Sequence, residues 1–401
     1  MIAIEKFKNA AKMIKGRVIR TPLVHSSSLS RMFGGEIYLK LENLQKTGSF
    51  KIRGATYTIM VNRANIGPGG VVAASAGNHA QGVALAASQA QLPATIVMPE
   101  WASITKQEAT RAYGGEVVIA GQSLGESLKK AEDMIQAGKM FIHPFNDPDI
   151  ITGQGTVALE ILEDLRNTDM ILVPVGGGGL ISGIASVVKA VRPEVRVVGV
   201  QSSACPSAHE ARRQGKLVRV DARQSIADGI SVRQLGELNF EIIQKNVDDL
   251  VLVQEEDIAA AILLLLERKK ILAEGAGAVT LAALLNGSVA VPRKGKTVLM
   301  ISGGNVDSPL LGRILGQGLS KHGRIMRFKV TLDDRPGSLA QLLAVISELK
   351  ANVLHIYHDR SERNLPIYVT RVDLEIETRS PAHVDEISRK LIEVGYELEL
   401  R

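Results

Sequence analysis

Residues 170–180 read MILVPVGGGGL and carry the clearest signal of the fold class. An apolar, β-rich run passes through four consecutive glycines directly into a stretch of helical period. Because glycine has no side chain, the backbone N–H groups of residues 176–179 can approach a phosphate without obstruction. Four glycines in a row have little structural use otherwise. The stretch therefore predicts a strand, a phosphate-binding loop and a helix.

The same order of strand, turn and helix recurs on both sides of this stretch. Further apolar β-rich runs lie at residues 71–74, 94–98, 116–119, 195–200 and 297–301. Their alternation with helical stretches is typical of a mostly parallel sheet with helices on both faces. Sheets of this kind bind ligands at the carboxyl ends of their strands. We therefore expect an α/β fold with its site in the loops after the strands.

A dinucleotide-binding fold is the main alternative for a glycine-rich loop after a strand. Its G-x-G-x-x-G pattern does not fit, because the third position falls on Ile181 or Ser182. The next strand ends at Gln201, which offers no carboxylate to a ribose hydroxyl. We therefore disfavour NAD and an NAD-linked oxidoreductase.

Composition excludes several other classes of protein. The chain has 401 residues and a single cysteine, Cys205, so a disulfide framework and a cysteine-built zinc site are excluded. Its longest apolar run, residues 259–266, is far shorter than the ~20 residues that cross a bilayer, and charged residues at positions 5, 6 and 8 argue against a signal peptide. Basic residues are scattered and only 3% of residues are aromatic, which disfavours nucleic acid. We expect a soluble, cytoplasmic protein with no membrane or nucleic-acid partner.

The pattern changes at residues 319–324, LSKHGR, where a short basic stretch precedes a run of alternating polarity. Strands are then predicted at 326–332, 352–357, 367–377 and 396–400, and helices at 338–350 and 384–394. The order βαββαβ is the ferredoxin-like arrangement. We expect a large domain over residues 1–318, with a smaller lobe at about 52–145, and a second domain over 325–401.

The segment GSFKIRGA, residues 48–55, places Lys51 between the apolar Phe50 and Ile52. Most lysines are solvated surface residues. A lysine in apolar surroundings, however, loses its proton more easily and can form a Schiff base with a carbonyl.

Two further motifs follow predicted strands. Residues 75–82, SAGNHAQG, open a helix whose free N–H groups favour a carboxylate or phosphate, although an ordinary helix cap fits them equally. Residues 301–305, ISGGN, place Ser302 where it can bond to a heterocycle nitrogen or merely cap a helix. Glu274, between small residues, either faces a cavity or lies on the surface.

Together and in this order, these motifs resemble those of the pyridoxal-phosphate enzymes of the tryptophan-synthase-β type (fold type II). Within that group they are most similar to the threonine ammonia-lyases, or threonine dehydratases. The resemblance extends from about Phe7 to Leu319. It implies a two-lobed catalytic part with mostly parallel sheets and the cofactor pyridoxal 5'-phosphate.

The resemblance also implies a role for each motif. Lys51 would hold the cofactor and act as the catalytic base, Phe50 and Asn78 would contact the ring and its 3-hydroxyl, and Ser302 would face the ring nitrogen. The phosphate would be bound by Gly176, Gly177, Gly178 and Gly179. The substrate would be bound by Ser75, Ala76, Gly77, His79 and Glu274.

The implied reaction is deamination of L-threonine to 2-oxobutanoate and ammonia, and of L-serine to pyruvate. Ala76 stands where serine racemases of this group carry a hydroxyl, which favours dehydration over racemisation. Residues 201–204, QSSA, stand where those relatives bind a divalent cation through carboxylates, so we expect no metal. Serine racemase and hydroxyaspartate ammonia-lyase stay open as alternatives.

Residues 332–339, LDDRPGSL, belong to a segment that resembles an ACT regulatory domain. An effector amino acid would be bound by Asp334, Gly337, Ser338 and Leu339. A turn with a helix cap would use the same residues. One such domain implies control by isoleucine or valine at the first step of isoleucine biosynthesis, in a homodimer or homotetramer. A non-catalytic amino-acid sensor is the alternative from another class.

Overall fold

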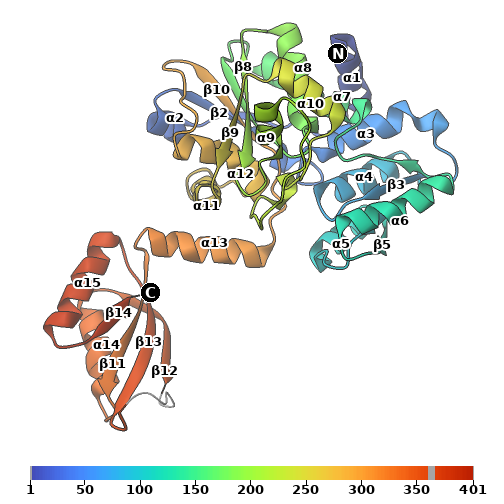
Figure 1. Cartoon of the computed structure of the whole chain (residues 1–401). Helices are drawn as coiled ribbons and strands as arrows, with labels where there is room; N and C mark the ends of the chain where they lie inside the picture. Colours follow the sequence, from blue (N-terminus) through green and yellow to red (C-terminus); the bar gives the residue numbers. More distant parts are fainter. Residues whose placement is uncertain (1, 360–365, 401) are drawn as a thin grey trace. The chain divides into compact units, whose positions relative to one another are not determined.

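The structure is a computed structural model that describes residues 2–359 and 366–400. The chain forms two compact units, Met1–Asp307 and Ser308–Arg401 (Figure 1). The helix α13 (Ser308–Lys321) belongs to the second unit. The domain bounds expected above, 1–318 and 325–401, stay a prediction.

The larger sheet of the first unit has the strand order β1-β2-β10-β7-β8-β9. Its strands are β1 (Leu23–His25), β2 (Glu36–Leu41), β7 (Met170–Pro174), β8 (Arg196–Ser202), β9 (Asp249–Val253) and β10 (Lys296–Ile301). All neighbours pair in parallel except β1 and β2. Every residue of β7 is buried, because helices cover both faces of a parallel sheet.

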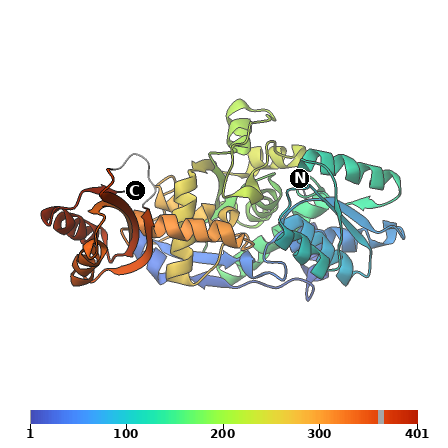
Figure 2. The ribbon, with the colours of Figure 1, turned by 90° about the horizontal axis from the view of Figure 1, so that it is seen from below.

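The smaller sheet has the order β5-β4-β3-β6 and is parallel throughout. Its strands are β3 (Val71–Ala74), β4 (Ala94–Met98), β5 (Glu116–Ile119) and β6 (Met140–Phe141). Its helices are α3 (Lys51–Val61), α4 (Asn78–Gln89), α5 (Ile104–Ala112) and α6 (Leu124–Gln136). In both views these elements form a lobe on one side of the first unit (Figure 1 and Figure 2). The α/β class with mostly parallel sheets was predicted correctly.

The remaining helices of the first unit are α1 (Ile4–Ile14), α2 (Ser27–Phe33), α7 (Pro148–Asp164), α8 (Gly179–Val191), α9 (Ser207–Gln214), α10 (Glu237–Asn246), α11 (Glu255–Leu264) and α12 (Gly275–Leu285). Asp147 caps α7 by accepting hydrogen bonds from two backbone N–H groups, and Pro148 starts the helix. Helices α3 and α7 touch closely, because a Cβ on Gly153 would lie 2.6 Å from the Cα of Gly54. This contact fixes the start of α3 against α7.

The second unit has the predicted order of strands and helices. It contains β11 (Ile325–Asp333), α14 (Ser338–Glu348), β12 (Asn352–Asp359), β13 (Val369–Glu377), α15 (Pro381–Glu393) and β14 (Leu398–Leu400). The strands form an antiparallel sheet in the order β12-β13-β11-β14. Burial alternates along β11, so that Phe328 and Val330 pack against Ile346 of α14 and Leu391 of α15. The ferredoxin-like βαββαβ fold is confirmed.

Two observations bear on the excluded classes. Among the helices of the described residues, none has the length and apolar character needed to span a bilayer. The single cysteine, Cys205, is buried just after β8.

Candidate active site

One cavity of the first unit, with a volume of about 260 Å³, is lined by all of the residues predicted to bind cofactor or substrate. They come from five stretches of the chain: Phe50 and Lys51, residues 75–79, residues 176–179, Glu274 and Ser302. The predicted effector residues line a different cavity, in the second unit. The fold therefore brings each predicted set together, while the role of each residue stays a prediction.

Lys51 is the first residue of α3, and its side chain reaches into the cavity. Its Nζ donates a hydrogen bond to the backbone oxygen of Pro144 at 2.8 Å and lies 5.3 Å from the ring centroid of Phe50. Burial lowers the pKa of Lys51 to about 8, although the negative charge of Glu274 opposes the shift. Near neutral pH a fraction of this amine is therefore unprotonated and nucleophilic.

The four glycines form the turn between β7 and α8. Gly178 has a φ of 98°, which a side chain disfavours, and a Cβ on Gly177 would lie 2.3 Å from the ring of Phe145. Helix α8 has no side chain capping its N-terminus. Its first N–H groups and the positive end of its dipole therefore suit an anion at the cavity wall.

The loop 75–79 leads from β3 into α4, whose N-terminus also has no side-chain cap. The Nε2 of His79 lies 2.8 Å from the backbone oxygen of Ile142, so this nitrogen carries the proton and donates. Burial, with the positive charge of Lys51, lowers the pKa of His79 to about 3, and the ring is neutral. Its Nδ1 is buried without a protein partner.

Glu274 precedes α12 and faces the same cavity. Its Oε1 accepts a hydrogen bond from Asn78 Nδ2 at 2.7 Å. Burial, together with the charge of Asp228, raises the pKa of Glu274 to about 8. At neutral pH this carboxyl group is therefore mostly protonated. Ser302, which follows β10, is buried as well.

Sequence patterns missed residues that line this cavity or support its walls from outside. Asn239 of α10 donates hydrogen bonds to the backbone oxygens of Gly177 and Phe145 at 2.9 and 3.1 Å and so holds the glycine loop. Lys106 of α5 lies 3.2 Å from Asp228 and 3.5 Å from Asp307, which belong to other parts of the first unit. No local signal marks these residues, because their partners lie far away in the sequence.

The region expected to lack a cation site is filled by protein contacts. Gln201 Oε1 accepts hydrogen bonds from the backbone N–H groups of Ala208 and His209 at 2.9 and 3.2 Å. Ser202 donates to Glu255 at 2.7 Å. Over residues 2–359 and 366–400, no three or more His, Cys, Asp or Glu side chains are grouped to hold a metal ion.

The donor set of the cavity fits pyridoxal phosphate. The Lys51 amine suits the aldehyde, and the uncapped start of α8 suits the phosphate. A Cβ at Gly177 would clash with Phe145, so the loop keeps its amides open to the cavity only with glycine there. A hydroxyl at Ser302 suits the edge of a heterocycle.

Comparison with known families defines the class of this protein. The family described as "Pyridoxal-phosphate dependent enzyme" matches residues 14–303, and the ACT domain matches residues 326–391. The chain therefore belongs to the pyridoxal-phosphate dependent enzymes, its cofactor is pyridoxal phosphate, and its second unit contains an ACT domain. The resemblance inferred from the sequence motifs is confirmed.

Individual relatives narrow the class. The chain is 50% identical to L-threonine ammonia-lyase of Thermotoga maritima over 402 residues, covering 100% of both chains. It is 46% identical to L-threonine ammonia-lyase of Geobacter sulfurreducens over 397 residues, covering 99% of this chain and 98% of the other. Among solved structures, a threonine deaminase from T.th. matches with a TM-score of 0.72 and 39% identity, over 76% of this chain and 99% of that one. Maize serine racemase matches with a TM-score of 0.74 and 34% identity, over 79% of this chain and 98% of the racemase chain.

Proposed function

We propose that the protein deaminates L-threonine to 2-oxobutanoate and ammonia, and L-serine to pyruvate. The observation that carries the proposal is the single cavity in which the Lys51 amine, the glycine turn and the 75–79 loop meet. Similarity over the full chain to two L-threonine ammonia-lyases supports the choice of substrate.

Pyridoxal phosphate, when bound, supplies an electron-withdrawing group that stabilises the charge left when the substrate α-proton is removed. The chain supplies the rest. The N–H groups of residues 176–179 bind the phosphate, and those of the 75–79 loop bind the substrate carboxylate at the start of α4. The Nζ of Lys51, with its lowered pKa, takes the α-proton. The β-hydroxyl group leaves with one proton as water, so the α-proton and the hydroxide together account for the water that is lost. The released enamine then reacts with water to give the 2-oxoacid and ammonia.

The neutral state of Glu274 helps substrate binding. A charged carboxylate in this cavity would repel the substrate carboxylate. Because the pKa of Glu274 is raised to about 8, the group is mostly uncharged at neutral pH. Ser302 would likewise offer an uncharged hydroxyl to the ring nitrogen of the cofactor, which suits a short elimination reaction better than a long-lived carbanion.

The second unit is proposed to bind isoleucine or valine and so to control the first step of isoleucine biosynthesis. Its cavity, about 260 Å³, is lined by Asp334, Gly337, Ser338 and Leu339, together with His358 and Thr370. Helix α14 begins after Gly337 without a side-chain cap, so its N-terminus suits a carboxylate. We also propose that the protein is cytoplasmic and forms a homodimer or homotetramer.

A substrate panel tests the proposal. The purified chain with pyridoxal phosphate is assayed for 2-oxoacid release from L-threonine, L-serine and β-hydroxyaspartate, with and without isoleucine or valine. Threonine is expected to react fastest, with a rate that depends on one of the two effectors. D-serine as the main product would favour the racemase instead, and a cofactor-loaded protein without turnover on any of these amino acids would favour the amino-acid sensor.

A further inference from the structure

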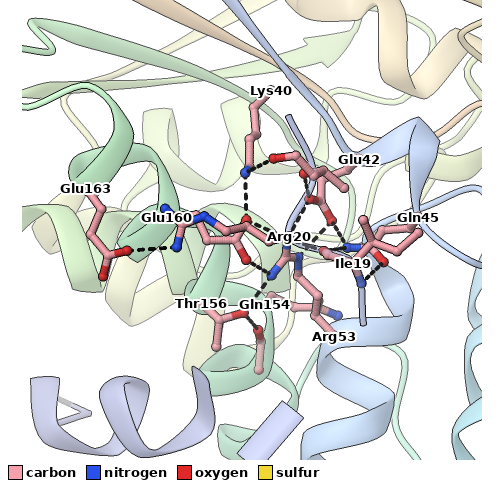
Figure 3. Close-up of polar contacts among 12 residues, drawn as sticks. Ile19, Arg20, Lys40, Glu42, Gln45, Arg53, Gln154, Thr156, Glu160 and Glu163 are labelled. Carbon is pink, nitrogen blue, oxygen red and sulfur yellow. Dashed lines mark hydrogen bonds and ion pairs between the residues drawn. The ribbon is translucent and has the colours of Figure 1, made fainter. Parts of the chain in front are cut away.

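Behind the Lys51 helix lies an ionic network that touches neither Lys51 itself nor the glycine turn (Figure 3). Arg53, Lys40 and Glu42 are fully buried, and Glu160 is nearly so. Figure 3 shows the guanidinium of Arg53 between the two carboxylates, with Lys40 above them. Two positive and two negative charges therefore balance inside the protein.

The geometry of Arg53 leaves its guanidinium little freedom. Nε and Nη2 donate to the two oxygens of Glu42, each at 2.8 Å. Nη1 and Nη2 donate to the two oxygens of Glu160 at 2.6 and 2.9 Å. Two bidentate pairs fix both the position and the plane of the group. Burial is the strongest single influence and raises the pKa of Glu42, but the charge and hydrogen bonds of Arg53, with smaller contributions from Thr21 and Lys40, together hold that pKa below its usual value.

The anchors of Arg53 lie outside α3. Glu42 stands in the turn η1 (Glu42–Leu44), which follows β2 of the larger sheet, and Glu160 belongs to α7. Lys40 of β2 donates to the same Glu160 at 2.6 Å and to the backbone oxygen of Thr21 at 2.6 Å. The network therefore ties α3 to the larger sheet and to α7 at once.

Arg53 follows Lys51 by two positions on the same helix. With 3.6 residues per turn, the two side chains leave α3 about 200° apart, on nearly opposite sides. Lys51 reaches the cavity, and Arg53 reaches the network behind the helix. The first turn of α3 has no side-chain cap, and its Gly54 N–H donates to Gln154 of α7 at 3.2 Å. The contacts of Gly54 hold this turn against α7, and the bonds of Arg53 to Glu42 and Glu160 add the restraint that fixes its rotation.

We propose that Arg53 is a positioning residue for Lys51: clamped by Glu42 and Glu160, it sets the rotation of α3 and hence where the Lys51 amine lies. The inference rests on the catalytic role proposed for Lys51. It deepens that role, because displacement of a reacting group by about 1 Å can reduce a rate by about a hundredfold.

The test compares two arginines that each have two carboxylate partners. Arg53→Lys keeps the buried charge but loses the planar fork. Arg20→Lys makes the same change at an arginine that pairs with Glu163 and Asp164 but is half exposed, with 51% of its side chain accessible. Both full-length variants are loaded with pyridoxal phosphate and assayed well below their melting temperatures for kcat, KM and the visible absorbance of bound cofactor against pH.

For Arg53→Lys we expect kcat to fall between about tenfold and about a hundredfold, with KM within about threefold. We also expect the midpoint of the absorbance titration to move by about half a pH unit or more, because the surroundings of the Lys51 nitrogen change. A role in stability alone would move neither the midpoint nor the ratio of kcat to KM. Arg20→Lys should match the wild type, and an Arg53→Lys enzyme that also matches it would overturn the proposal.

Further variants keep the test decisive if Arg53→Lys does not fold. Glu160→Gln retains the shape of one anchor. Thr156→Val removes the hydroxyl that accepts a 3.3 Å hydrogen bond from Arg53 and donates one to the backbone oxygen of Gly153 at 2.7 Å. Both should show the same changes at smaller size, and wild-type values in both would refute the inference. If the wild type binds cofactor but releases no 2-oxobutanoate from threonine, the proposed function is wrong, while the absorbance titrations still decide the role of Arg53.

Discussion

The first cavity, at the candidate active site, and the second, in the ACT domain, contain the same type of glycine turn in different surroundings. Gly178 and Gly337 each precede a helix without a side-chain cap, with φ values of 98° and 97°. At Gly178 a Cβ would lie 2.7 Å from Asn239, whereas at Gly337 it would meet no atom of the described residues within 4 Å. The first turn is packed inside the protein, and the second is open to solvent on its side-chain face.

The surroundings of the two turns indicate that one cavity is suited to catalysis and the other to binding alone. An uncapped helix start binds a carboxylate or phosphate in either setting. Only the first cavity adds a buried lysine whose pKa is lowered to about 8 and a glutamate whose pKa is raised to about 8. Proton transfer near neutral pH needs groups of this kind. This difference supports the proposal that the reaction takes place in the first cavity and that the effector binds in the second.

Lys51→Ala should cause the largest change. Without the amine, turnover of threonine should fall by on the order of a thousandfold or more, because both cofactor attachment and proton removal depend on it. Isoleucine or valine binding to the second unit, measured by calorimetry, should persist. Lys46→Ala, at an exposed lysine of the same segment, is the control and should keep full activity. Retained turnover in Lys51→Ala would contradict the mechanism.

Gly178→Ala should weaken cofactor binding by about a hundredfold. The left-handed conformation costs alanine about 1–2 kcal/mol, and the clash with Asn239 moves the loop as well. Fluorescence titration with pyridoxal phosphate measures the effect. Gly395→Ala makes the same change at a φ of 97°, with no atom within 4 Å, and should leave cofactor affinity unchanged. Equal affinities in the two variants would show that strain at Gly178 does not shape the phosphate site.

Gly337→Ala should raise the effector concentration for half-saturation by roughly tenfold, because strain of about 1–2 kcal/mol distorts the turn before α14. The measurement is threonine turnover against isoleucine or valine. If the response does not change, the effector binds elsewhere and the comparison of the two turns fails.

Glu274→Gln should change how Tm depends on pH, with a difference of a few degrees between the variant and the wild type. The pKa of Glu274 is raised to about 8, so its protonated form stabilises the fold fully below the usual carboxyl pKa, and this contribution is lost as pH rises through about 8. Glutamine has no such proton to lose. The Tm of the variant relative to wild type should therefore increase from about pH 5 to about pH 9. Glu108→Gln, at an exposed carboxylate, should show no such trend.

Contiguous motifs carried most of the correct predictions. The strands at 71–74, 94–98 and 116–119, and the run at 170–173 that forms most of β7, were predicted because buried parallel strands are mostly apolar on both faces. The glycine turn and the 75–79 loop were predicted because strand, loop and helix follow one another in the sequence. The order of elements in the second unit was predicted from alternating polarity, which antiparallel strands with one solvent face retain.

The buried polar contacts could not be predicted from the sequence, because each of them joins residues that lie far apart along the chain. Strand β2 contains Lys40, and a lysine is usually expected to face solvent. Lys40 is nevertheless fully buried, where it forms an ion pair with Glu160. The same holds for Arg53, whose carboxylate partners lie 11 and 107 positions away. Asn239 supports the glycine turn from a helix 62 positions beyond Gly177. Such pairs follow from tertiary packing and leave no local pattern.

The single cysteine has a practical consequence for measuring how an effector acts. Cys205 is 1% exposed, and burial raises the pKa of its thiol, so thiol-reactive dyes should react with it slowly in the native protein. A cysteine introduced at an exposed site, such as Ala382→Cys on α15, would then be the preferred labelling position. A fluorophore there would report on the second unit while the enzyme turns over its substrate.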